Sequence, residues 1–228
     1  MSERQQIAET VASVIRERKT LKVLGSGEDR AVLSPEVAAK HRETVLEALE
    51  VSGWAPFHFA IGEDGLAEPW RAHVFWHGDC QELADRMLDW FADLVPQNKI
   101  LAMLNACGAL VIVNWLPQHY DSDVRNAARI IQDEENLAAA SAMVQNLLLM
   151  LTAHGMGTYW SSGGKLRNPA FFERTGIPAN ERLLAAVFVE YPETLEEKKP
   201  RIPGKHRHRR SGGWIREFSF PAESVSAE

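Results

Sequence analysis

The ten residues Gly155-Met156-Gly157-Thr158-Tyr159-Trp160-Ser161-Ser162-Gly163-Gly164 follow the most apolar helix that the sequence predicts. Glycines can adopt positive φ or let a flat ligand approach the main chain, and the short serines leave backbone N–H groups open to an acceptor. We interpret the segment as a cofactor cradle. Taken alone, it favours a simpler interpretation, a helix C-cap at Gly155 followed by a turn. The other segments of the chain decide between the two.

The helix predicted before this segment runs from Asp133 to His154, with Glu134 and Glu135 in its first turn. Its second half is apolar on most sides, so we expect it to be buried, in part against a second subunit. Two short apolar runs, 108–115 and 183–191, predict strands that are buried on both faces, and the first should lie in the middle of a sheet.

Helical periodicity and capping residues predict the remaining elements. We expect helices over 6–17, from Ser34-Pro35 to Val51, through Leu83 to Leu94 with Pro96 closing it, and over 170–175; we also expect a strand over 72–76 and an extended surface segment over 192–213. The first helix has an apolar face made of Ile7, Val11, Val14 and Ile15. These elements predict a single α+β domain over residues 1–228.

Composition excludes several classes of protein. The chain has 228 residues, of which 45% are hydrophobic and 25% charged, and its net charge of −6 argues against a dedicated nucleic-acid binder. We see no apolar run of membrane-span length and no signal peptide, so we expect a cytoplasmic protein without a membrane partner. Cys80 and Cys107 show neither CxxC spacing nor a secretory context, which predicts reduced, buried thiols and no metal site.

Three cations and a hydroxyl lie within the five residues Arg18-Lys19-Thr20-Leu21-Lys22. In an extended conformation Arg18, Thr20 and Lys22 would project to one side, where they could grip a phosphate through charge-assisted hydrogen bonds. The alternative, favoured without other evidence, is a solvated basic end of the first helix that complements the helix dipole.

Four separated segments together resemble the flavin-dependent nitroreductase family. They are Arg18–Lys22, the Ala55-Pro56 loop leading to Pro69-Trp70, the long helix with Gln145-Asn146-Leu147 that runs into Gly155-Met156-Gly157-Thr158, and Lys199-Pro200-Arg201-Ile202-Pro203. Their order and separations fit a family of this length, and the resemblance spans nearly the whole chain.

The resemblance implies a three-layer α+β fold, with a central, mostly antiparallel sheet flanked by helices. It also implies an obligate homodimer with two FMN sites at the subunit interface, and residues 192–228 as a C-terminal arm exchanged across the dimer. The implied site residues are Arg18, Lys19, Thr20, Lys199 and Arg201 at the FMN phosphate, Lys22 at the pyrimidine edge, Ser162 and Gly163 at flavin N5, and Pro56, Phe57 and His58 covering the ring from the other subunit.

The implied activity is that of an FMN-dependent NAD(P)H oxidoreductase. By ping-pong kinetics it would pass hydride from NAD(P)H through flavin N5 to a small electron-poor acceptor such as a nitroaromatic or a quinone. Because the cofactor carries the chemistry, we expect no catalytic side chain.

The sequence departs from the family pattern in the loop around residue 57. Phe57 and His58 replace the hydroxyl residues that the family commonly has, and this bulky loop motivates an alternative: a flavin-binding sensor or storage protein without significant turnover. A tail that binds nucleic acid through Lys198 to Arg210 is disfavoured, and so is metal binding by His206 and His208.

Overall fold

The computed structural model describes residues 1–25, 30–61, 65–118, 127–196, 204, 206, 209 and 214–218. Its centre is a four-stranded sheet of β1 (Trp70–Trp76), β2 (Ala109–Trp115), β3 (Gly157–Ser161) and β4 (Arg182–Glu190). The strand order is β1-β2-β4-β3, and each of the three neighbouring pairs is antiparallel. The prediction of a central antiparallel sheet is therefore confirmed, with the 109–115 strand in its middle.

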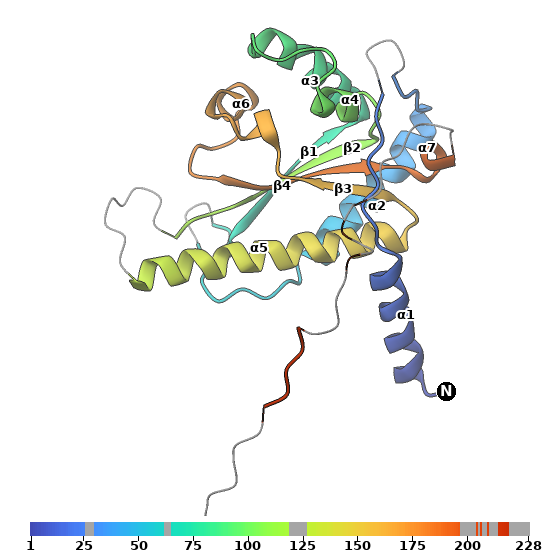
Figure 1. The fold of residues 1–228 in the computed structure, drawn as a ribbon, viewed down its shortest axis with the longest axis vertical. Coiled ribbons are helices and arrows are strands. Elements are labelled where there is room, and N and C mark those ends of the chain that lie inside the picture. Colours follow the sequence, from blue (N-terminus) through green and yellow to red (C-terminus); the bar gives the residue numbers. More distant parts are fainter. Residues whose placement is uncertain are drawn as a thin grey trace, which may run out of the picture.

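Strand β2 is buried on both faces because it alternates between two apolar clusters. Ala109, Val111 and Val113 belong to one cluster, whereas Leu110 and Ile112 belong to the other. The side-chain period of two along a strand makes this division. Helices cover both faces of the sheet in Figure 1, which gives the three layers that the resemblance implied.

Helices α2 (Pro35–Ser52) and α5 (Ala127–Ala153) pack on one face of the sheet. Helix α5 begins six residues before the predicted start at Asp133, so Glu134 and Glu135 do not lie in its first turn. The reason is that Asp133 does not cap the helix: its carboxylate accepts a hydrogen bond from the Gln118 N–H at 2.8 Å. Alanines at 127 and 128 are strong helix formers and extend the helix toward the N-terminus.

Helices α3 (His77–Trp90), α4 (Lys99–Leu104) and α6 (Pro169–Thr175), with the short 3₁₀ helix η1 (Gly164–Arg167), pack on the other face. Helix α6 has the predicted Asn168 N-cap and Gly176 C-cap. Helix α3, however, ends well before Pro96. Phe91 adopts an extended backbone and is buried in this second cluster, so packing of its ring ends the helix before the proline is reached.

The two cysteines lie in the second layer, and both are buried free thiols, as predicted. Burial raises the pKa of the Cys80 thiol well above its ordinary value, and a hydrogen bond with Cys107 raises it further. The Cys80 thiol is therefore held neutral and unreactive.

Helix α1 (Glu3–Glu17) projects from the body of the molecule in Figure 1 and begins at Ser2 with a capping box. It has no buried residue, and its predicted apolar face is open in the single chain: Ile7, Val11 and Ile15 are each about half exposed.

The prediction that residues 192–213 are extended is wrong for their first part, where α7 (Pro192–Glu196) forms. Proline is favourable at the start of a helix, and Thr194 packs into the interior. Glu193 anchors α7 to α2, since its Oε2 lies 2.6 Å from Nε2 of His41.

The Ala128–Ala153 part of α5 is long and apolar enough to cross a membrane by length and composition, with a mean hydropathy of 1.3 in its most apolar window. It was the one such helix found among the described residues. This is weak evidence for a membrane span, because 44% of that window is buried inside the protein and a core helix meets the same criterion.

Candidate functional site

The first motif runs along the free edge of the sheet. Thr20 pairs in parallel with Thr158 of β3, and the Leu21 N–H donates to the Thr158 carbonyl at 2.8 Å. The extended conformation expected for this motif is therefore present, and it joins the basic residues directly to the glycine-rich segment. The sequence did not predict β3, because the strand is glycine-rich and is defined by its pairing with β4.

Successive side chains of this extended segment point to opposite sides, which separates the cations of the motif. Lys22 lies over the ring of Tyr159, with Nζ 4.8 Å from the ring centroid. Lys19 is exposed and lines a different hollow together with Leu21, Gly155 and Met156. Arg18 is half-buried and caps α1 through its N–H, which donates to the Val14 carbonyl. The side chains of Thr20 and Lys22 thus lie on the same side of the segment, whereas Lys19 lies on the other side.

A second lysine, Lys99 at the start of α4, belongs to this site and was missed in the sequence. Burial lowers the pKa of Lys22, and the positive charge of Lys99 lowers it further. The two cations are therefore close enough to repel each other. An anionic ligand bound beside them would reduce this repulsion. No spacing in the sequence links residues 22 and 99, so only the fold could reveal this pair.

The turn after β3 is built around two glycines with positive φ, Gly163 at 99° and Gly164 at 51°. Gly163 is buried, and its N–H donates to the Ser161 hydroxyl at 3.1 Å. Ser162 is exposed, and its carbonyl accepts a hydrogen bond from Nε of Arg167. This backbone leaves no room for a side chain at Gly163, where a Cβ would overlap Cδ2 of Leu183.

The loop of Pro56, Phe57 and His58 lies apart from these groups, against α5 on the opposite face of the sheet. With Glu135, Ala138, Ala139 and Ala142 the three residues line an open hollow of about 340 Å³. Phe57 packs edge-on against Trp70 at 5.6 Å between ring centroids, and His58 Nδ1 is 3.2 Å from Oε2 of Glu135. Within one chain the loop does not join the Thr20–Gly163 region.

Lys199 and Arg201, predicted to hold the phosphate, lie outside the described residues. Gly204, three residues beyond Arg201, is described and lies against Thr20: a Cβ on Gly204 would be 3.2 Å from the Thr20 hydroxyl oxygen. Gly204 therefore lies beside the first motif, although the two residues are far apart in sequence.

The groups gathered at the sheet edge fit a flat, anionic cofactor. Lys22 and Lys99 supply positive charge, Thr20 supplies a neutral donor, and the tight Ser162–Gly164 turn lets a ligand approach the backbone. Among the described residues, no group of histidine, cysteine, aspartate and glutamate side chains could hold a metal ion.

The family model of the nitroreductase family matches residues 30–189 of this chain. The chain therefore belongs to the nitroreductase family, a class of flavin-dependent oxidoreductases. A relative from Bacillus subtilis (strain 168), "Putative NAD(P)H nitroreductase YfhC", is 26% identical over 170 residues, which are 72% of this chain and 80% of the relative.

Solved structures show the same fold. The nitroreductase-like family protein from Bacillus cereus is 21% identical with a TM-score of 0.55, over 88% of this chain and 94% of that one. CinD from Lactococcus lactis, in complex with nicotinic acid, is 16% identical with a TM-score of 0.54, over 80% and 89%. Iodotyrosine deiodinase, bound to FMN and 3-iodo-L-tyrosine, is 16% identical with a TM-score of 0.52, over 92% and 100%.

Proposed function

We propose that this protein is an FMN-dependent NAD(P)H oxidoreductase that reduces a small electron-poor acceptor, such as a nitroaromatic or a quinone. The observation that carries the proposal is the repelling pair Lys22 and Lys99 beside the glycine turn at Gly163, at the sheet edge of a nitroreductase fold. Bound FMN would supply the redox chemistry by accepting hydride from NAD(P)H at N5 and releasing it to the acceptor.

In this proposal the side chains bind and orient the cofactor. Arg18 and Thr20, with Lys199 and Arg201, hold the phosphate, whose two negative charges need several donors. Lys19 was expected to join them but lines a different hollow, so it is left out of the proposed phosphate site. Lys22 and Lys99 stabilise negative charge at the pyrimidine edge. At the N5 side, the Gly163 N–H is engaged by the Ser161 hydroxyl, so ligand binding would share or replace that hydrogen bond.

We also propose a homodimer in which Pro56, Phe57 and His58 cover the partner's flavin. Three observations support it. These residues lie apart from their own chain's Gly163 turn, and α1 exposes Ile7, Val11 and Ile15 in the single chain. The aromatic residues of the arm, Trp214 and Phe218, are also exposed, at 71% and 81%. Apolar surface of this extent on separate elements is typical of subunit interfaces.

An absorbance spectrum of the purified protein tests the cofactor, and NADPH oxidation with a quinone acceptor tests the activity. We expect flavin bands, turnover, and sedimentation as a flavin-loaded dimer at micromolar concentration. Arg18→Ala should weaken FMN retention about ten- to hundredfold, as expected for one charge-assisted contact, while Arg4→Ala on the exposed side of α1 serves as the control.

Each negative outcome contradicts a different part of the proposal. A colourless protein that FMN cannot reconstitute would exclude the cofactor. A yellow protein without turnover with either NADH or NADPH would favour the flavin-binding sensor or storage protein. A stable, flavin-loaded monomer would exclude the shared site.

A further inference from the structure

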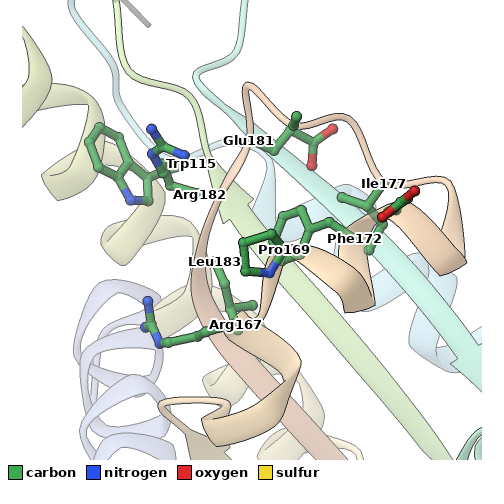
Figure 2. Close-up of a pocket in the computed structure, with 10 residues that line it drawn as sticks. Trp115, Arg167, Pro169, Phe172, Ile177, Glu181, Arg182 and Leu183 are labelled. Carbon is green, nitrogen blue, oxygen red and sulfur yellow. The ribbon is translucent and has the colours of Figure 1, made fainter. Parts of the chain in front are cut away.

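Arg167 of η1 is bound to the turn that follows β3. Its Nε donates a hydrogen bond to the carbonyl of Ser162, and its Cγ would lie 3.5 Å from a Cβ built on Gly163. Leu183 lies against Gly163 as well, and Figure 2 shows Arg167 and Leu183 next to each other in the wall of a cavity of about 640 Å³. The function proposed above gives Arg167 no role.

The guanidinium of Arg167 acts on a peptide group and not on a carboxylate. Glu173 and Glu181 line the same cavity, but among the residues that the structure describes neither of them forms an ion pair with Arg167. The acceptor that the structure gives to Arg167 is the carbonyl of Ser162. A hydrogen bond from a charged donor is about twice as strong as one between neutral groups, so this contact holds the peptide group between Ser162 and Gly163 firmly.

The same peptide group is also held at its N–H end. The Gly163 N–H donates to the Ser161 hydroxyl at 3.1 Å. The C=O and N–H groups of a trans peptide point in opposite directions, so the hydrogen bond from Arg167 to the Ser162 carbonyl also fixes the direction of the Gly163 N–H. Hydrogen bonds in a chain polarise one another, so the charge at the carbonyl makes this N–H a stronger donor.

We propose that Arg167 is a positioning residue for the flavin, because it holds and polarises the peptide group whose Gly163 N–H donates to flavin N5. This inference rests on the function proposed above, which supplies the flavin. In the free protein the Ser161 hydroxyl accepts that N–H, and flavin N5 takes its place as acceptor when FMN binds. Arg167 acts through the peptide group and has no contact of its own with the flavin.

Equilibrium dialysis of the full-length protein, freed of bound flavin, tests the proposal with three ligands. They are FMN, 5-deaza-FMN, in which a C–H group replaces N5 and accepts no hydrogen bond, and riboflavin, which lacks the phosphate. We expect the wild type to bind FMN about three- to tenfold more tightly than 5-deaza-FMN, which corresponds to one hydrogen bond. Arg167→Met should lose most of this preference, by binding FMN more weakly and 5-deaza-FMN as the wild type does. Riboflavin should be weakened as much as FMN, because the phosphate is not involved.

Two further variants separate the role of Arg167 from a general effect of charge. Arg167→Lys keeps a charged donor for the Ser162 carbonyl and should retain part of the preference for FMN over 5-deaza-FMN. Arg174→Met is the matched control, since it removes an exposed arginine of α6 that lies over the ring of Trp90. It should leave the affinity for all three ligands unchanged. Arg167 is exposed, so we expect its variants to fold, and urea unfolding checks this.

Each contrary result has its own meaning. If Arg167→Met keeps the wild-type preference for FMN over 5-deaza-FMN, the inference is overturned and Arg167 only stabilises the turn. If the variant weakens FMN but not riboflavin, the inference is overturned because Arg167 acts on the phosphate. A wild type that binds FMN and 5-deaza-FMN equally overturns it as well, since no N–H then reaches N5. A wild type that binds none of the three flavins contradicts the proposed function itself, and this inference fails with it.

Discussion

Gly163→Ala is the substitution that most directly tests the turn after β3. The φ of 99° at Gly163 disfavours any residue with a Cβ by about 1–2 kcal/mol. The added methyl group would also overlap Cδ2 of Leu183, which is buried in the core, and overpacking of this kind costs about 1–3 kcal/mol. We therefore expect the free energy of unfolding to fall by about 2–5 kcal/mol.

A matched control separates the two contributions. Gly176, the C-cap of α6, has a φ of 73°, but a Cβ there would meet no atom within 4 Å. Gly176→Ala should therefore show the conformational cost alone, about 1–2 kcal/mol. The difference between the two variants measures the overlap with Leu183.

Urea unfolding followed by circular dichroism gives the free energies, and Leu183→Val completes a double-mutant cycle. The shorter side chain removes the overlapping atom, so the double variant should be more stable than the sum of the two single changes predicts. FMN retention after dialysis should fall for Gly163→Ala and stay unchanged for Gly176→Ala. Equal stability of the two glycine variants, or strict additivity with Leu183→Val, would refute the packing argument.

Two further substitutions test the site charge and the core. Lys22→Met should stabilise the FMN-free protein at about pH 7 and weaken FMN retention. The folded-state pKa of Lys22 lies below its ordinary value of 10.5, so the charge of Lys22 destabilises the fold at neutral pH. This cost disappears as the pH rises from the folded-state pKa to the ordinary pKa. Urea unfolding at neutral and alkaline pH measures it, and equal stability of variant and wild type at both would contradict it. Gly108→Ala should destabilise the protein by about 1–3 kcal/mol in the same assay, since a Cβ would lie 2.6 Å from Cε2 of the buried Tyr191 ring; Gly78→Ala, with open space around it, should not.

The elements that the sequence predicted best are those whose signal is local. β2 and β4 are continuous apolar runs, and α6 carries Asn168 and Gly176 at its two ends. Two helix boundaries were predicted wrongly because tertiary contacts decide them. Burial of the Phe91 ring ends α3 before Pro96, and the hydrogen bond from the Gln118 N–H to Asp133 means that α5 does not start at Asp133.

The candidate site was predictable only in part for the same reason. Thr20, Lys22 and the glycine turn carry recognisable residue types, and the structure places them along one edge strand. Lys99 is an ordinary surface lysine by sequence, and its role comes from the position of α4 beside Lys22.

The edge position of β3 connects stability to cofactor binding. One side of β3 pairs with β4, whereas on the other side the described residues form only the bridge to Thr20, which leaves much of this edge for a ligand. The same edge holds Lys22 and Lys99, whose repulsion costs stability in the free protein. An anionic cofactor would relieve that repulsion while binding only the folded state, and a ligand at about a hundred times its Kd stabilises the fold by about 2.7 kcal/mol. The features that weaken this edge in the free protein are therefore the features that FMN would stabilise.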